Sequence, residues 1–254
     1  MSICPGSTAR PRAIDLANGD NNPYEFPPHN RHMTRDRYEA ELEALKEGVT
    51  SMATLVVERL REAARAYEDG DEDGGREIAQ RDDEINELYL ELESECIDLL
   101  ALQQPVAGDL RFVVATFKIL TDLERIADLA ANIGRYAGTP GRDRLTVVPI
   151  ADIADMASSQ VADAIAAYVE ADPEQCRTVV AGDTDLDQRC EAAADDLVRY
   201  LATYDAAGDD HETLLADTKQ FLLTVRDLER VGDHAVNIAA RTFYMIESDD
   251  ELIY

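Results

Sequence analysis

Apolar residues recur at alternating spacings of three and four residues from about residue 35 onward. This spacing places them on one face of an α-helix, so it predicts a long amphipathic helix from about Arg35 to Tyr67. The acidic, glycine-rich segment 68–75 (EDGDEDGG) is expected to end this helix. The predicted apolar face consists of Tyr38, Leu42, Leu45, Val49, Met52, Val56, Leu60, Ala63 and Tyr67.

The same periodicity predicts five further helices, and strand patterns are nearly absent. The predicted helices span about 76–103, 105–136, 150–171 and 173–204, and the last ends near residue 246. A Gly- and Pro-containing segment, 138–149, separates the third helix from the fourth. We therefore predict an all-α fold of two tandem three-helix bundles, 34–137 and 150–254, joined by the linker 138–149.

The first 33 residues have no such periodicity. They are rich in Pro, Gly and Asn, which is typical of a disordered or loosely attached tail. We predict that residues 1–33 do not belong to either bundle.

Two segments of the chain resemble each other closely. Residues 122–133 (DLERIADLAANI) and 227–238 (DLERVGDHAVNI) share eight residues at the same places, 105 residues apart. Because each segment falls on the third helix of its half, the match indicates an internal duplication. It pairs Glu124 and Asp128 with Glu229 and Asp233.

Each duplicated pair has two carboxylates four residues apart, hence on one face of a helix. The preceding helix of each half adds acids on its own periodic face, Asp82 in the first half and Asp183 and Asp187 in the second. Clustered carboxylates repel one another unless a cation or a proton lies between them. We predict two sites for divalent cations; such oxygen donors suit Mg, Ca, Mn and Fe.

Two other interpretations of the acids remain open. In one, they are solvated or paired with Arg125 and Arg230, which follow at helical spacing, and the protein is a metal-free helical adaptor. In the other, the chain is a carboxylate-bridged metal enzyme, although phosphate-binding loops, dinucleotide-binding motifs, Glu-x-x-His motifs and nucleophile motifs are all missing. We predict that the protein is not an enzyme.

Composition restricts the partners. With 53 acidic and 24 basic residues, the net charge is −29, which disfavours contact with nucleic acid phosphates and anionic lipids. The same charge predicts stability that depends on salt, as in halophilic proteins. The four cysteines form no Cys-x-x-Cys pair, and no segment has the length and apolar character of a membrane span. We expect a cytoplasmic protein without a membrane-inserted segment.

The segments QQPVAGDLRFVVATFKILTDLERIADLAANI and FLLTVRDLERVGDHAVNIAAR resemble the signature helices of the PhoU family of phosphate-uptake regulators. The resemblance covers roughly 35–246 and implies a six-helix fold with Glu/Asp-x-x-x-Asp motifs that bind iron or zinc. It also implies negative regulation together with the ATPase of a phosphate ABC transporter, at the transporter, and with a sensor kinase. We also expect a homodimer.

Transferred residue by residue, the resemblance assigns eight metal-ligand positions. These are Asp82, Asn86, Glu124 and Asp128 in the first half, and Asp183, Asp187, Glu229 and Asp233 in the second. Asn86 replaces the second acid of its helix, and Ala127 stands where the second half has Gly232. An amide oxygen coordinates without contributing charge, so we expect tighter binding in the second bundle.

Overall fold

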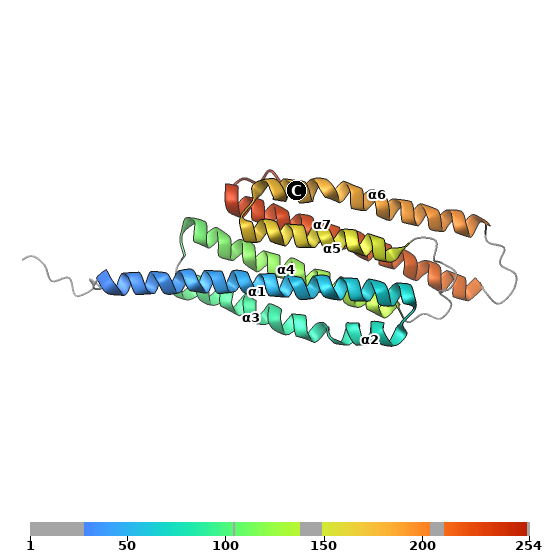
Figure 1. Ribbon diagram of the computed structural model, residues 1–254, viewed down its shortest axis with the longest axis horizontal. Coiled ribbons are helices and arrows are strands. Elements are labelled where there is room, and N and C mark those ends of the chain that lie inside the picture. The colour runs from blue at the N-terminus through green and yellow to red at the C-terminus, as the bar shows by residue number, and fades with distance from the viewer. Residues whose placement is uncertain (1–27, 104, 138–148, 204–210, 253–254) are drawn as a thin grey trace, which may run out of the picture. The chain divides into compact units, whose positions relative to one another are not determined.

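The computed structural model describes residues 28–103, 105–137, 149–203 and 211–252, with side chains from residue 35 onward. These residues form seven helices and, within the same ranges, no strand, which confirms the predicted all-α class (Figure 1). The helices are α1 (Pro28–Asp69), α2 (Glu72–Gln80), α3 (Asp82–Gln103), α4 (Ala107–Tyr136), α5 (Ile150–Glu170), α6 (Pro173–Thr203) and α7 (His211–Glu247).

Residues 40–254 form one compact unit, and residues 1–39 form a second. The described part of the second unit is the beginning of α1, where Arg35 Nε lies 2.9 Å from Glu39 Oε1. The predicted tail included residues 28–33, but these belong to α1; the remainder of the tail lies outside the described residues. Because proline is tolerated in the first turn of a helix, Pro28 is compatible with this earlier start.

The first three-helix bundle consists of α1, the α2–α3 pair and α4. Helix α4 packs against both α2 and α3. Helix α1 lies so close to α3 that a Cβ atom on Gly48 would meet Leu92 Cδ2 at 2.4 Å. The core of this bundle includes the fully buried side chains Leu45, Met52, Leu60, Ile85, Ile119 and Leu123.

The second bundle consists of α5, α6 and α7, each packed against the other two. It joins the first bundle through α4 and α7, which run antiparallel to each other (Figure 1). The tandem three-helix arrangement is therefore confirmed. The linker segment 138–148 lies outside the described residues, and the exact domain bounds stay a prediction.

The predicted second helix is divided in two, which the periodicity did not indicate. Helix α2 ends at Gln80, and the Arg81 backbone N–H donates to the carbonyls of Glu77 and Ile78. Three consecutive acids, Asp82, Asp83 and Glu84, then begin α3. Acidic side chains stabilise a helix N-terminus, so this sequence favours a new helix start at Asp82.

The acidic segment at the end of α1 is a short turn. Gly70 has φ +65°, a conformation that favours glycine, and the Asp71 side chain accepts a hydrogen bond from the Gly74 backbone N–H. Glu68 and Asp69 end α1, and Glu72 and Asp73 lie in the first turn of α2. Of the helices described, none has the length and apolar character needed to span a membrane.

Candidate functional site

The four predicted ligands of the second bundle lie on α6 and α7, which pack together. Burial raises the pKa of Asp183, and the Asp187 and Asp233 carboxylates raise it further. Burial, followed by Asp187 and Asp233, likewise raises the pKa of Glu229. The structure thus brings all four acids within electrostatic range of one another across one helix pair.

Asp183 is the best-enclosed of these acids. Its Oδ1 accepts a hydrogen bond from Gln160 Nε2 of α5 at 3.0 Å. A Cβ atom on Gly232 of α7 would lie 2.9 Å from the same oxygen and 2.5 Å from Leu186 Cδ2. The glycine therefore allows α7 to approach Asp183 closely, and all three helices contribute to its surroundings.

The remaining acids of this set are more exposed than the sequence indicated. Asp187, Glu229 and Asp233 are solvent-exposed, and Asp183 is half-buried. Although they lie on the periodic faces of their helices, these three side chains do not face the interior, because the apolar contact of α6 with α7 is made by neighbours such as Leu186 and Val231. The carboxylates border that contact and are only partly desolvated.

The first-bundle set lies on α3 and α4 and is half-buried throughout. Burial raises the pKa of Asp82, and the Asp128 carboxylate raises it further, while a hydrogen bond to the Asn86 side chain lowers it. Burial and the Asp128 carboxylate also raise the pKa of Glu124. The structure thus places Asp82, Asn86, Glu124 and Asp128 near one another.

The first set already has a protein cation beside it. Arg125 Nη1 lies 3.3 Å from Asp128 Oδ2, and Arg125 Nε lies 3.4 Å from Glu124 Oε2. No equivalent ion pair joins a described arginine to Glu229 or Asp233; Arg230 instead lies 3.8 Å from Asp227. The second set therefore has less internal charge compensation than the first.

Both sets suit a hard or borderline divalent ion in donor type, because they offer only carboxylate and amide oxygens. Their side chains are not arranged as a formed metal site, since in the described residues no group of three His, Cys, Asp or Glu side chains converges closely enough to hold an ion. Ion binding would thus require rotation of the exposed side chains. The negative charge of the second set is less compensated by ion pairs with arginine, so this set fits a cation better than the first.

Two buried acids at the α4–α7 contact were given no role in the sequence analysis. Asp122 Oδ1 lies 3.0 Å from His234 Nδ1, and Asp122 Oδ2 lies 2.7 Å from Arg241 Nε. Asp227, the duplicate of Asp122, is hydrogen-bonded to the Tyr136 side chain of α4. The signal was available, because both acids begin the repeated DLER segment.

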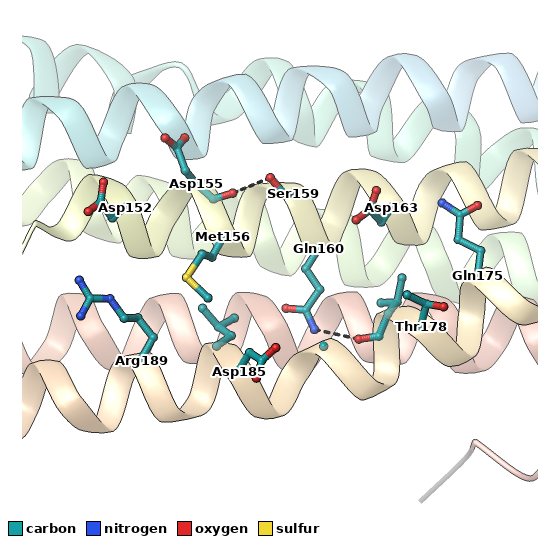
Figure 2. Close-up of a pocket in the computed structure, with 13 residues that line it drawn as sticks. Asp152, Asp155, Met156, Ser159, Gln160, Asp163, Gln175, Thr178, Asp185 and Arg189 are labelled. Atoms are coloured by element: carbon teal, nitrogen blue, oxygen red, sulfur yellow. Dashed lines mark hydrogen bonds between the residues drawn. The ribbon is translucent and has the colours of Figure 1, made fainter.

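A groove on the second bundle is lined by none of the eight predicted ligands. It has a volume of about 910 Å³ and runs between α5 and α6, with Met156, Val179 and Leu186 among its apolar lining (Figure 2). Gln160 reaches from α5 toward α6 within it and connects the groove to Asp183.

Comparisons with known proteins agree on one family. The family model described as the PhoU domain matches residues 49–137 and again residues 150–242. These ranges fall one on each bundle.

Individual relatives match over most of their length. A phosphate-specific transport system accessory protein PhoU homolog of Clostridium acetobutylicum is 31% identical over 219 residues, covering 84% of this chain and 96% of the relative. The homolog of the same description from Pseudomonas aeruginosa is 29% identical over 222 residues, covering 86% and 89%. A crystal structure of PhoU from P. aeruginosa superposes with a TM-score of 0.74 at 29% identity, covering 84% of this chain and all of that one.

Proposed function

Because the chain belongs to the PhoU family, we propose that it is an accessory regulator of phosphate transport that acts by binding other proteins. The observation that carries the proposal is the double match of the PhoU domain, once on each bundle. Relatives named as accessory proteins of the phosphate-specific transport system cover most of both halves, which supports a shared role.

The regulation is mainly negative, and the partner is the ATPase subunit of a phosphate ABC transporter. The protein then works at the cytoplasmic face of that transporter, as a homodimer, with a sensor kinase as a second partner. An all-helical chain with net charge −29 suits a protein partner better than a nucleic acid or an anionic membrane surface.

Divalent cations bind the carboxylate sets and bias the packing of the helices that carry them. Asp183, Asp187, Glu229 and Asp233 hold the tighter ion, and Asp82, Asn86, Glu124 and Asp128 hold the weaker one. Arg125, which lies beside Glu124 and Asp128 of the first set, supports this order, because it already compensates part of the negative charge there. When bound, the ion supplies positive charge that holds α6 against α7, and no chemical step.

A metal-free adaptor is the second candidate, favoured by the Arg125 contacts with Glu124 and Asp128. Elemental analysis of protein purified without chelators separates the two candidates. We expect bound metal in the wild type, a loss in the Glu229→Ala/Asp233→Ala variant and a smaller loss in Glu124→Ala/Asp128→Ala. Wild-type protein that contains no stoichiometric metal would support the metal-free adaptor.

The regulatory role is tested in cells. Deletion of the gene should raise phosphate uptake when phosphate is abundant, and the wild-type gene should restore the original rate. Uptake that is unchanged by the deletion at both high and low phosphate would contradict the proposal. The metal-site variants, expressed at equal level in the deletion strain, then show whether regulation needs the ion.

A further inference from the structure

The packed pair of helices α3 and α4 has two sides, and α1 covers one of them. On the covered side, a Cβ atom on Gly48 of α1 would meet Leu92 Cδ2 of α3 at 2.4 Å. Two residues correspond to about 200° around an α-helix, so Leu90 points almost opposite to Leu92. Leu92 is 3% exposed, whereas Leu90 is 59% exposed. We call the side of the helix pair that carries Leu90 the open face.

Large apolar side chains occupy one half of the open face. Ile97 follows Leu90 by seven residues and lies in the last two turns of α3. Leu110 and Val114 lie in the first three turns of α4, the helix that returns beside it. These four residues are between 40% and 59% exposed. Single exposed leucines are common on proteins, but a group of four on adjoining turns of two packed helices is typical of a binding surface.

The other half of the open face carries the first acid set. Residues spaced by three or four run along one side of each helix, from the acids to the apolar group. On α3 this series is Asp82, Asn86, Leu90, Glu93 and Ile97, and on α4 it is Leu110, Val114, Phe117, Thr121, Glu124 and Asp128. Tyr89 of α3 joins the two series, because its hydroxyl donates to Glu93 Oε1 at 2.8 Å and its side chain is also hydrogen-bonded to Thr121.

The second bundle differs from the first in the apolar group. Helix α3 matches α6 at an offset of 101 residues, and α4 matches α7 at an offset of 105. The matched pairs are Leu90 and Glu191, Ile97 and Val198, Leu110 and Leu215, and Val114 and Lys219. The same fold therefore accepts charged residues at two of the four positions, and packing within the bundle does not explain why the first bundle has leucine and valine there.

The charges of the open face restrict what can cover it. Four half-buried carboxylates lie on it, against Lys118 and Arg125 at its α4 edge, so the face is net negative. The carboxylates are those of Asp82, Glu93, Glu124 and Asp128. The same face of a second copy, and an anionic membrane, would both be repelled. A partner segment that is apolar at one end and basic at the other complements both halves.

We propose that the open face binds an amphipathic helix of a partner protein, with apolar side chains against the exposed apolar group and Lys or Arg side chains against the first acid set. A helix is the fitting element because α1 already packs as a helix on the opposite side of the same pair. The carboxylates fix its direction. Helix α4 rises about 21 Å from Val114 to Asp128, so the bound helix has about 15 to 18 residues.

The inference deepens the proposed function by stating the chemistry of a partner, and it rests on that function only in assuming that the protein acts by binding other proteins. Binding of a synthetic helix by the purified protein does not depend on phosphate uptake. A failed peptide experiment would leave the regulatory role untouched, and unchanged uptake after gene deletion would leave the binding surface untouched. A divalent ion would use the same carboxylates, so the peptide is titrated in the presence of a chelator.

The probe is a fluorescein-labelled synthetic helix of about 18 residues, with three leucines on one face of its first half and two lysines in its last two turns. Its fluorescence anisotropy is followed as full-length protein is added, and we expect saturable binding. A peptide of the same composition in a non-amphipathic order should bind at least about tenfold more weakly. So should a peptide in which glutamates replace the lysines.

Matched variants locate the apolar half of the site. Ile97→Gln/Leu110→Gln should weaken binding by at least about tenfold, because both anchors are lost. Val198→Gln/Leu215→Gln, the same change at the matched positions of the second bundle, should leave binding within about twofold of wild type. Val114→Lys, which introduces the residue type of the second bundle, should also weaken binding. All of these residues are exposed, so the variants should keep the helix content and melting temperature of the wild type.

The acidic half is tested with a second pair of variants. Glu124→Gln/Asp128→Asn should weaken binding of the lysine peptide by about tenfold and that of a peptide with glutamine in place of lysine by less than about twofold. Glu229→Gln/Asp233→Asn, the matched change in the second bundle, should alter neither affinity by more than about twofold. This cycle assigns the lysines to the first acid set.

Several results would overturn the proposal. These are the absence of saturable binding up to about 1 mM protein, equal binding of the non-amphipathic peptide, and wild-type affinity in Ile97→Gln/Leu110→Gln. Equal weakening by the second-bundle variants would show that the open face is not the site. A sedimentation coefficient that rises with protein concentration in the wild type, and no longer does so in Ile97→Gln/Leu110→Gln, would identify a second copy of the chain as the occupant.

Discussion

Asp122 of α4 and Arg241 of α7 form a close ion pair across the contact between the two bundles, with 2.7 Å between Oδ2 and Nε. The Asp122 side chain is 5% exposed, and that of Arg241 is 29% exposed. In the duplication, Asp227 of α7 corresponds to Asp122, and Tyr136 of α4 corresponds to Arg241. The side chains of Asp227 and Tyr136 are hydrogen-bonded to each other. The contact between α4 and α7 thus has approximate twofold symmetry in its polar residues.

Replacement of Arg241 by Gln should destabilise the protein strongly. The substitution leaves the Asp122 carboxylate buried with only His234 beside it, and removal of one partner of a buried ion pair costs about 3 kcal/mol. We expect a decrease of this size in the free energy of unfolding, measured by urea denaturation at fixed salt. Arg199→Gln, at an arginine whose side chain is 71% exposed, should cost less than about 0.5 kcal/mol.

A double-mutant cycle identifies the pair as the cause. Asp122→Asn combined with Arg241→Gln should be less destabilised than the sum of the two single variants, because neither partner is then left as an unpaired charge. Additive losses would show that Arg241 acts through packing alone.

Hydrophobic periodicity was sufficient to predict the helices because each helix buries one continuous apolar face. It missed the break at Arg81 since the apolar positions Ile78 and Ile85 keep helical spacing across it, and only the backbone deviates. Residues 28–33 were assigned to the tail because they have no apolar period. Helix α1 nevertheless begins at Pro28.

The acid sets were predictable because duplication places matched carboxylates on neighbouring helices. Their exposure was not predictable. Periodicity shows which face of a helix carries a side chain, but it does not separate the centre of a buried face from its edge. Glu229 and Asp233 lie just outside the buried face. Gln160 escaped notice because an amide on an apolar face gives no chemical motif. Only the structure shows that it donates a hydrogen bond to Asp183.

In the metal-free protein, prepared with a chelator, the free energy of unfolding should rise as pH falls through the range just above ordinary carboxyl pKa values. Burial and neighbouring carboxylates raise the pKa values of Asp82, Glu124, Asp183, Glu229 and Asp233 in the folded protein. The folded state then holds these protons more strongly than the unfolded state, so the stability they confer is lost as pH rises through the raised values. Thermal melting at constant ionic strength should show a midpoint a few degrees higher near pH ~5 than at pH ~7.5.

The control is a variant with fewer of these acids. Asp183→Asn/Glu229→Gln should melt at a higher temperature than wild type at neutral pH and depend less steeply on pH. Added Mn²⁺ should stabilise the wild type at neutral pH and have a smaller effect on the variant. A wild type whose stability falls on acidification over this range would contradict the raised pKa values.

Gly232→Ala should destabilise the second bundle and disturb Asp183. The new Cβ atom would lie 2.5 Å from Leu186 Cδ2 and 2.9 Å from Asp183 Oδ1, and such overpacking costs about 1–3 kcal/mol. Gly182→Ala is the matched control on α6, since its Cβ would have no neighbour within 4 Å. That variant should gain about 0.5–1 kcal/mol from the better helix propensity of alanine. Urea denaturation should show a lower free energy of unfolding than wild type for Gly232→Ala and a higher one for Gly182→Ala.

Arg59→Gln should destabilise the first bundle, where the buried Arg59 guanidinium pairs with Glu84 and lies near Glu62. The substitution removes a buried guanidinium and its packed stem, so we expect a loss of about 2 kcal/mol in unfolding free energy.

In this variant the vacated space between Glu62 and Glu84 should accept an external arginine. Nα-acetyl-arginine amide should raise the melting temperature of Arg59→Gln more than that of wild type, and the citrulline analogue should not. The control is Arg61→Gln, which removes a half-exposed arginine of α1 that pairs with Asp155 of α5, and it should show no such rescue. Rescue by both analogues, or by neither, would mean that burial of the Arg59 stem, and not recognition of its charge, explains the position.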